Sequence, residues 1–237
     1  MFHCIYRISD KGYIKTKLEN ADKMRCLDSF LSEFRRDNVL VIADNCTPQT
    51  VMKLKQKKLK LVETSLGNAG SFLYAAKYAI DHFDEDDYVY LCEDDYLYKK
   101  NARDILLEGA EIADYATLYD HPDKYNDFAG NPFIKNGGEK TKVYLTNSSH
   151  WKETNSTTMT FIIKVKTLKE DFPIWKIFGN NDFLGFRILT GNFLTQDDVN
   201  FAKQMEVKKR KLISSIPGYS THCEVQWLSP LTDWTKF

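Results

Sequence analysis

Three consecutive carboxylates stand near the middle of the chain, directly after an apolar stretch. Residues 88–92, YVYLC, have the aromatic and β-branched composition of a strand buried inside a sheet, and Glu93, Asp94 and Asp95 follow at its end. Burying like charges against a packed strand end is costly, so such a cluster normally has a cation or a basic group beside it. A hard divalent cation, held by one or two of these carboxylates and by the phosphates of a ligand, would balance the charge.

The alternative is that Glu93 to Asp95 form an acidic turn that faces water, as most charged runs do. A second acidic run, at residues 84–87, follows an expected helix and precedes the strand, so we interpret that run as the solvated turn. The first cluster lies at the other end of the strand and has apolar and aromatic residues on both sides. Ligands bind at the carboxyl ends of strands in open α/β sheets, so we favour a ligand site there.

Alternating strand and helix patterns precede the acidic cluster. The predicted strands are residues 2–9, 39–43, 59–64 and 88–92. The first two predicted helices are residues 20–36 and residues 48–57, the second with Thr47 as its cap. A third predicted helix follows the glycine-containing loop 66–71 and extends to Phe83. This order is typical of right-handed βαβ units, which build a mostly parallel sheet.

The second half of the chain has a different rhythm. Residues 143–146 and 158–164 predict two strands of a hairpin around a polar loop that holds Trp151. A helix over residues 167–178 is expected to be interrupted at Pro173. The other predicted elements are helices at residues 101–113, 181–189 and 196–203 and strands at residues 116–119 and 211–216.

Composition places the chain among ordinary globular proteins of one large or two small domains. Of its 237 residues, 33 are Lys or Arg and 33 are Asp or Glu, and this balance argues against a nucleic-acid partner bound by broad electrostatic attraction. No run approaches the roughly 20 apolar residues that cross a membrane, and the N-terminus lacks the pattern of a signal peptide. The five cysteines lack metal-type spacing and are expected to be buried thiols. We therefore expect a cytoplasmic protein.

Six short motifs are spread over most of the chain. They are IYRIS at residues 5–9, Asp44 after the second strand, GNAGS at residues 67–71, the acidic cluster, GNNDFLGF at residues 179–186 and PGYSTH at residues 217–222. This set resembles the GT-A class of nucleotide-sugar glycosyltransferases, particularly the small stand-alone enzymes of large DNA viruses and phages. The resemblance implies a single GT-A, Rossmann-like α/β domain with a mixed, mostly parallel central sheet flanked by helices. Residues 1–118 would bind the nucleotide sugar, and residues 119–237 would form a smaller acceptor-binding half with a metal-binding C-terminal tail.

The resemblance also implies roles for the acidic cluster, which is a variant of the family's DxD motif without its usual spacing. Asp95 would bind Mn²⁺ or Mg²⁺, and Asp94 would reach the ribose or phosphate side of the donor. His222 matches a second metal ligand of similar enzymes, and an imidazole suits Mn²⁺ better than Mg²⁺. From the residues alone, His222 could instead be a partly exposed residue of the tail.

Asp182 matches the carboxylate that serves as general base in similar inverting enzymes, at the start of a helix beside the acceptor. The alternative is that it only caps that helix, and Asp197 and Asp198 are weaker candidates for the base. Four aromatic side chains could stack on sugar rings: Trp151, Trp175, Phe183 and Trp227. Most aromatic residues of this chain, however, are expected in the core.

A nucleotide site at the same sheet edge is chemically reasonable. A uracil ring has one N–H donor between two carbonyl acceptors, so Asp44 can accept from the donor while Arg7 or a backbone N–H serves the carbonyls. Arg7 and Ser9 end the first strand at the edge where Asp44 ends the second, although Asp44 could also be an ordinary turn residue. Asn68 and Ser71 could help to bind the negative groups of a ligand, or could only form turn and helix-cap hydrogen bonds.

These features predict a metal-dependent hexosyl- or pentosyltransferase. It would move a sugar from a nucleoside-diphosphate sugar, with a UDP-sugar as the favoured donor, to a hydroxyl of a glycan or glycoprotein. Inversion is favoured because it needs only one base. Two alternatives stay open: a sugar-nucleotide nucleotidyltransferase, which would normally carry a glycine-rich basic loop near the N-terminus, and a non-catalytic module that binds glycans or nucleotide sugars.

Overall fold

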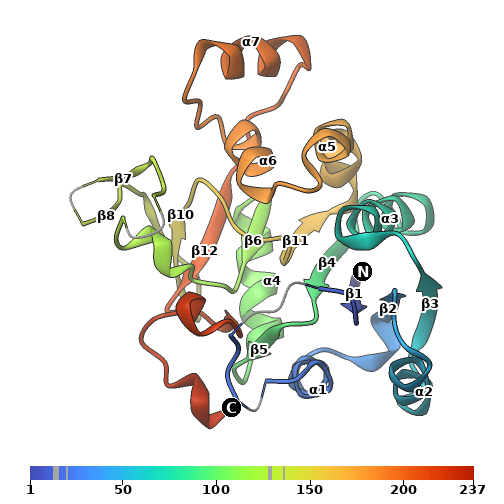
Figure 1. The fold of residues 1–237 in the computed structure, drawn as a ribbon. Helices are drawn as coiled ribbons and strands as arrows, with labels where there is room; N and C mark the ends of the chain where they lie inside the picture. The colour runs from blue at the N-terminus through green and yellow to red at the C-terminus, as the bar shows by residue number, and fades with distance from the viewer. Residues whose placement is uncertain (13–15, 20, 128–129, 136) are drawn as a thin grey trace.

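A nine-stranded mixed sheet forms the centre of the molecule, with the strand order β3-β2-β1-β4-β11-β6-β12-β10-β9 (Figure 1). The computed structural model describes residues 1–12, 16–19, 21–127, 130–135 and 137–237. Its strands are β1 (Phe2–Ser9), β2 (Val39–Asp44), β3 (Lys60–Thr64), β4 (Tyr88–Glu93), β6 (Tyr115–Thr117), β9 (Val143–Leu145), β10 (His150–Glu153), β11 (Phe161–Lys164) and β12 (Leu212–Ile216). Strands β1 to β4 are parallel, and β11 runs antiparallel to β4 and β6. The predicted α/β class with a mixed central sheet is confirmed.

Helices cover both faces of this sheet. One face packs against α1 (Lys23–Glu33), α2 (Pro48–Gln56) and α4 (Ala102–Ile112), and the other against α3 (Gly67–His82), α5 (Val165–Phe178) and α6 (Asp182–Leu189). The last helix, α7 (Gln196–Gln204), lies beyond α6 at the top of Figure 1. The predicted start of the first helix, Asn20, lies outside the described residues. Among the helices that the described residues form, none has the length and apolar character needed to cross a membrane.

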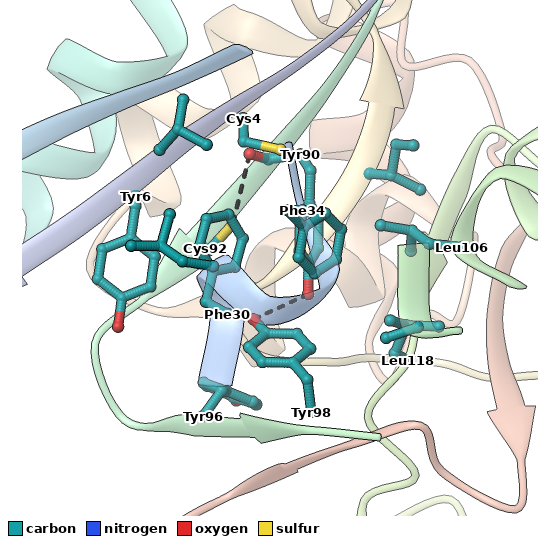
Figure 2. Close-up of a cluster of buried hydrophobic side chains, with 14 of the residues drawn as sticks. Cys4, Tyr6, Phe30, Phe34, Tyr90, Cys92, Tyr96, Tyr98, Leu106 and Leu118 are labelled. Carbon is teal, nitrogen blue, oxygen red and sulfur yellow. Dashed lines mark hydrogen bonds between the residues drawn. The ribbon is translucent and has the colours of Figure 1, made fainter. Parts of the chain in front are cut away.

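An aromatic cluster anchors the strand that carries the acidic residues (Figure 2). The rings of Phe30 and Phe34 stack with centroids 4.6 Å apart, and Phe34 also stacks on Tyr90 of β4 at 5.2 Å. The hydroxyl groups of Tyr90 and Tyr98 lie 3.2 Å apart, which links β4 to the segment after the cluster. Dense packing on both faces therefore fixes the end of β4, where Glu93 is placed.

The predicted hairpin of residues 143–146 and 158–164 is wrong. Strand β9 pairs with β10 instead, while β11 lies between β4 and β6 in the middle of the sheet. Trp151 lies in β10 and is fully buried, although it was expected in a polar loop. The polar residues around Trp151 concealed a strand with only one face in the core, which apolar composition alone does not reveal.

The predicted interruption at Pro173 is also wrong, because α5 continues through it. A proline inside a helix removes one backbone hydrogen bond and costs about 3 kcal/mol. Buried side chains on the same helix, including Leu168, Ile174 and Trp175, offset that loss by packing on the sheet.

Short strands outside the main sheet were not predicted. They are β5 (Tyr96–Tyr98), which pairs with β13 (Ser220–His222), and β7 (Ile134–Lys135), which pairs with β8 (Gly138–Glu139). The β5–β13 pair matters for function because it brings the PGYSTH segment beside the acidic cluster.

Candidate active site

A cavity of about 980 Å³ opens at the carboxyl ends of β1, β2 and β4. Parallel pairing sets Ser9 beside Asp44 and Arg7 beside Glu93, so the strand ends share one edge. Ligand pockets typically measure about 300–1,000 Å³, so the cavity is large enough for a nucleotide sugar. The predicted site residues that line it are Arg7, Ser9, Asp44, Asn68, Ser71, Asp94 and Asp95.

Arg7 connects three walls of this cavity from a buried position. Its Nη1 donates to the carbonyl oxygen and to Oδ1 of Asn68, at 3.2 and 3.1 Å, and to Oγ of Ser71 at 3.2 Å. Its Nη2 donates to Oε1 of Glu93 at 3.0 Å. Arg7 therefore holds β1, the first turn of α3 and the end of β4 together, and its contact with a nucleobase carbonyl stays a prediction.

The carboxylates of the acidic cluster have different partners. Glu93 pairs with Arg7, whereas Asp94 accepts from the backbone N–H of Ser9 at 2.9 Å and lies 3.6 Å from Nζ of Lys23. Burial raises the pKa of Glu93 and of Asp94, and the neighbouring Asp95 raises both pKa values further. The cluster is therefore not a solvated turn, and basic groups lie beside it as its charge requires.

Asp95 and His222 meet although they come from distant segments. The pairing of β13 with β5 sets His222 opposite Tyr96, and Nε2 of His222 lies 3.1 Å from Oδ2 of Asp95. The exposed fractions of these side chains are only 10% for His222 and 12% for Asp95. His222 is thus part of a buried pair rather than an exposed residue of the tail.

Nδ1 of His222 accepts from the backbone N–H of Glu224 at 3.2 Å, so a neutral ring carries its proton on Nε2 and donates it to Asp95. A divalent cation could take the place of that proton between the two atoms. Ligands about 2.1 Å from an octahedral ion lie about 3 Å apart when they are neighbours, close to the 3.1 Å between these two atoms. Within the described residues, no group of three or more His, Cys, Asp and Glu side chains is placed to hold a metal ion. A cation here would take its other ligands from phosphate oxygens and water, as protein-bound Mg²⁺ commonly does.

The carboxylate of Asp44 accepts hydrogen bonds from four donors of the protein itself. Oδ1 accepts from the backbone N–H of Leu66 at 2.6 Å and from the hydroxyl of Thr64 at 2.9 Å, and Oδ2 accepts from Gly67 N at 2.9 Å and Asn45 Nδ2 at 2.8 Å. These four bonds use the four lone-pair sites of a carboxylate. Asp44 therefore holds the loop before α3, and a nucleobase N–H would have to displace one of these donors to reach it.

Asp182 begins α6 beside the acidic cluster. The helix cap is Asn181, whose side chain accepts from Leu184 N at 3.0 Å, so Asp182 is not the cap. Burial raises the pKa of Asp182, while the hydrogen bond from the N–H of Phe183 opposes that rise. Asp182 in turn helps to raise the pKa of Glu93, which means that the two carboxylates share one electrostatic environment.

His121 and Asp123 form a polar pair near Asp182 that the sequence analysis missed. Nδ1 of His121 lies 2.7 Å from Oδ1 of Asp123, and Oδ2 of Asp123 accepts from Asn131 Nδ2 at 3.1 Å. Nδ1 also accepts from the backbone N–H of Asp123 at 3.2 Å, so both contacts at Nδ1 come from Asp123, and they orient the ring with Nε2 left for another partner. The strand predicted at residues 116–119 runs into these residues, and applying the strand-end rule to it as well would have found them.

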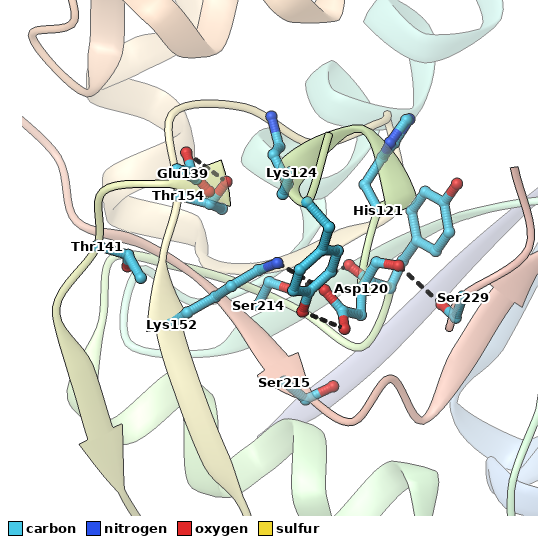
Figure 3. A network of polar contacts seen from close by, with 12 residues as sticks. Asp120, His121, Lys124, Glu139, Thr141, Lys152, Thr154, Ser214, Ser215 and Ser229 are labelled. Carbon is cyan, nitrogen blue, oxygen red and sulfur yellow. Dashed lines mark hydrogen bonds and ion pairs between the residues drawn. The ribbon is translucent and has the colours of Figure 1, made fainter. Parts of the chain in front are cut away.

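Lys124 follows this pair and is buried, with its Nζ donating to Oδ1 of Asn155 at 3.0 Å and to Oγ of Ser156 at 2.7 Å. In Figure 3 the side chains of His121 and Lys124 extend away from a second buried cation, Lys152. Lys152 pairs with Asp120 at 2.7 Å. The positive charge of Lys124 also opposes the rise in the pKa of Asp182. Lys124 and His121 thus both lie near the candidate base, Asp182.

The remaining candidates separate into structural and site residues. Asp198 is structural because it completes the capping box of α7 and pairs with Arg187 at 2.8 Å, and Asp197 is exposed. Trp151 and Trp175 are fully buried in the core. Trp227 is only half-buried, and its ring lies 5.1 Å from the ring of His121. Phe183 is also half-buried and lies 6.3 Å from Phe133.

Comparison with known proteins bears on the fold. No protein-family model matches the chain, and no curated protein sequence is detectably similar to it. The structure of GalNAc-T7 with UDP, GalNAc and Mn²⁺ matches with a TM-score of 0.52 and 12% identity over 90% of this chain and 42% of that one. The structure of residues 1–349 of Staphylococcus aureus TarS matches with a TM-score of 0.45 and 14% identity over 92% of this chain.

The chain spans 59% of the length of that TarS structure and less than half of GalNAc-T7. Strand order, the cavity at the carboxyl edge and the match to GalNAc-T7 agree on the architecture. The narrower resemblance to viral and phage enzymes stays a prediction. The chain has the GT-A fold of the nucleotide-sugar glycosyltransferases.

Proposed function

We propose that this protein is a glycosyltransferase that uses a nucleoside-diphosphate sugar, with UDP as the favoured nucleotide. The observation that carries the proposal is the buried Asp95–His222 pair at the end of β4, with Asp182 in the same electrostatic environment. A ligand pair for a cation and a separate, half-buried carboxylate are the two parts that glycosyl transfer needs at one site. The adjoining cavity has room for the donor.

Asp95 and His222 would hold the divalent cation, and the nitrogen ligand favours Mn²⁺ over Mg²⁺. When bound, the cation would neutralise the negative charge that develops on the leaving diphosphate. The similar fold of GalNAc-T7, whose structure contains UDP and Mn²⁺, supports the choice of UDP and a divalent cation. Asp94 would face the ribose or phosphate side, and Arg7, Ser9, Asn68 and Ser71 would shape the nucleotide end of the cavity.

Asp182 would take the proton of the acceptor hydroxyl. The acceptor oxygen forms a bond to the anomeric carbon, the bond from that carbon to the diphosphate oxygen breaks, and the hydroxyl proton moves to the Asp182 carboxylate. A raised pKa makes this carboxylate a stronger base than an exposed one. One base on the acceptor side is sufficient for inversion of the anomeric centre.

The acceptor would be a glycan or a glycoprotein that approaches from the side of α6. His121, oriented by Asp123, could form a hydrogen bond with a sugar hydroxyl through Nε2. The half-buried ring of Trp227 beside it offers an apolar face for a sugar ring. Neither side chain lines the nucleotide cavity, and the two rings lie beside one another.

Thermal unfolding with a panel of nucleoside diphosphates, each with and without Mn²⁺, tests the proposal. A ligand at about 100 times its dissociation constant adds roughly 2.7 kcal/mol to the free energy of unfolding, which a midpoint shift would report. We expect stabilisation by UDP that depends on Mn²⁺, followed by slow hydrolysis of a UDP-sugar without acceptor. No shift with any diphosphate would refute a donor site. Turnover of a nucleoside triphosphate with a sugar phosphate would indicate a nucleotidyltransferase, and binding without hydrolysis would indicate a binding module.

A further inference from the structure

Lys17 contacts the same oxygen atom that faces His222. Its Nζ lies 3.5 Å from Oδ2 of Asp95, the atom that is 3.1 Å from Nε2 of His222. The lysine side chain keeps 26% of its surface exposed and lines the cavity next to the carboxylates. The proposed cation position therefore already has an ammonium group at its edge.

Backbone hydrogen bonds fix this lysine in place. Residue 17 forms an antiparallel bridge with Glu224, and the N–H of Leu18 donates to the carbonyl of Cys223 at 2.9 Å. The N–H of Cys223 donates to the carbonyl of Asp95 at 2.8 Å. One segment of the tail thus positions His222 and Lys17 on the same carboxylate.

A divalent cation bound to Asp95 would repel this ammonium at close range. Two positive centres a few ångströms apart in a partly buried site interact strongly, and the flexible four-carbon stem of lysine lets the ammonium move. The cavity beside it is where the diphosphate of a donor would bring compensating negative charge. A lysine is a common partner of phosphate groups as a point charge.

We propose that Lys17 is an exchangeable counter-cation of the donor site. It neutralises Asp95 when no donor is bound, and it moves to the donor's diphosphate when the cation and the nucleotide bind together. The inference rests on the proposed function and deepens it, because it predicts that cation and nucleotide bind cooperatively. The cation alone must displace Lys17 from Asp95, whereas the nucleotide gives Lys17 a new partner.

Substitution of Lys17 by methionine separates the two roles, since methionine keeps an unbranched stem but has no charge. We expect Lys17→Met to bind Mn²⁺ alone roughly tenfold more tightly, because one repulsive charge is gone. The same variant should bind UDP at saturating Mn²⁺ roughly tenfold more weakly, because one phosphate contact is lost. Electron paramagnetic resonance of free Mn²⁺ measures the first affinity, and calorimetric titration with UDP measures the second.

Lys23→Met is the matched control. Lys23 lines the same cavity and carries the same charge, but its Nζ lies 3.6 Å from Asp10 and from Asp94 rather than near Asp95. We expect it to change the affinity for Mn²⁺ alone by much less than Lys17→Met does. Lys17→Arg keeps the charge and should leave Mn²⁺ affinity near that of the wild type. It is the variant to measure if the methionine variant does not fold.

The two affinities must move in opposite directions. A Lys17→Met variant that binds both Mn²⁺ and UDP as the wild type does, or binds both more weakly, would overturn the inference while the proposed function stands. If the wild type binds Mn²⁺ but no nucleotide, the proposed function fails and the inference fails with it. An equal gain in Mn²⁺ affinity in Lys23→Met would show a general charge effect and would also overturn the inference.

Discussion

The Nε2 atom of His222 lies 3.1 Å from Oδ2 of Asp95, and this contact joins the C-terminal tail to the acidic cluster after β4. Glu93 accepts a hydrogen bond from Arg7, and Asp94 accepts one from the backbone N–H of Ser9. The three carboxylates are equivalent in the sequence, but their hydrogen-bond partners distinguish them in the structure. Asp95 is the member of the cluster with a metal-type nitrogen ligand beside it. The predictions below start from that assignment.

Asp95→Ala should abolish the Mn²⁺-dependent part of UDP binding, because it removes the oxygen ligand of the proposed cation. Calorimetric titration of UDP with and without Mn²⁺ measures this difference directly. Asp86→Ala is the matched control, since Asp86 is exposed in the acidic turn before β4 and should leave both affinities unchanged. Unaltered metal-dependent binding in Asp95→Ala would remove Asp95 from the site.

Asp182→Asn should keep UDP affinity and lower turnover on the order of 10²-fold or more, because an amide cannot accept the acceptor's proton. Initial rates of UDP release, with calorimetry for affinity, test the two parts separately. Asp197→Asn changes an exposed carboxylate one helix away and should leave the rate unchanged. A variant with weakened donor binding but normal turnover would contradict the role of Asp182.

Asp123 should make stability depend on pH in the acid range. Burial alone would raise the pKa of Asp123, but the hydrogen bond from His121 and the charge of Lys124 outweigh it and lower the pKa from 3.8 to about 2. A lowered folded pKa stabilises the protein above the unfolded pKa, and this stabilisation of roughly 2 kcal/mol is lost as the pH falls from about 4 toward 2.

Urea unfolding of the wild type and of Asp123→Asn at pH 6 and pH 2.5 measures this contribution. The wild type should lose roughly 1–2 kcal/mol more than the variant on acidification, because the variant has no carboxylate to protonate. Asp86→Asn should lose as much as the wild type. Equal losses in the wild type and Asp123→Asn would show that the His121 contact does not stabilise the ionised form.

Gly109→Ala should destabilise the fold although alanine is the better helix former. A Cβ at position 109 would lie 2.5 Å from Cη2 of Trp151, and overpacking of this kind costs about 1–3 kcal/mol. The gain in helix propensity is only about 1 kcal/mol, so the balance is unfavourable. Urea unfolding measures the change. In a Trp151→Phe background, which lacks the overlapping ring atoms, the same substitution should cost less, and an equal cost would contradict the packing argument.

The sequence predicted strands β1, β2 and β4 and their shared edge well. Strands β1, β2 and β4 are buried on both faces, so their continuous apolar runs mark their boundaries within a residue or two. Parallel pairing then brings their carboxyl ends together without further information. For that reason the sequence alone predicts that Arg7 and Asp44 lie at one edge of the sheet, where the cavity opens.

Other parts of the candidate site depend on contacts between distant segments, which local patterns do not encode. Strands β5 and β13 have three residues each and exist because they pair with one another. Lys17 is one lysine in a polar loop, and only the bridge to Glu224 brings it to Asp95. The hydrogen bonds that saturate Asp44 come from the next strand and loop, so its structural role was equally hidden.

The tail has a consequence for how the protein is made. The sulfur atoms of Cys26 and Cys223 lie 3.6 Å apart although 197 positions separate the two residues along the chain. During translation the acidic cluster leaves the ribosome long before His222 does, so the sheet can collapse while its charged edge still lacks the imidazole. Closing a loop of this length is also entropically costly, which places docking of the tail late in folding. A nascent chain therefore completes the proposed site for the cation and donor only when residues 220–222 are in place.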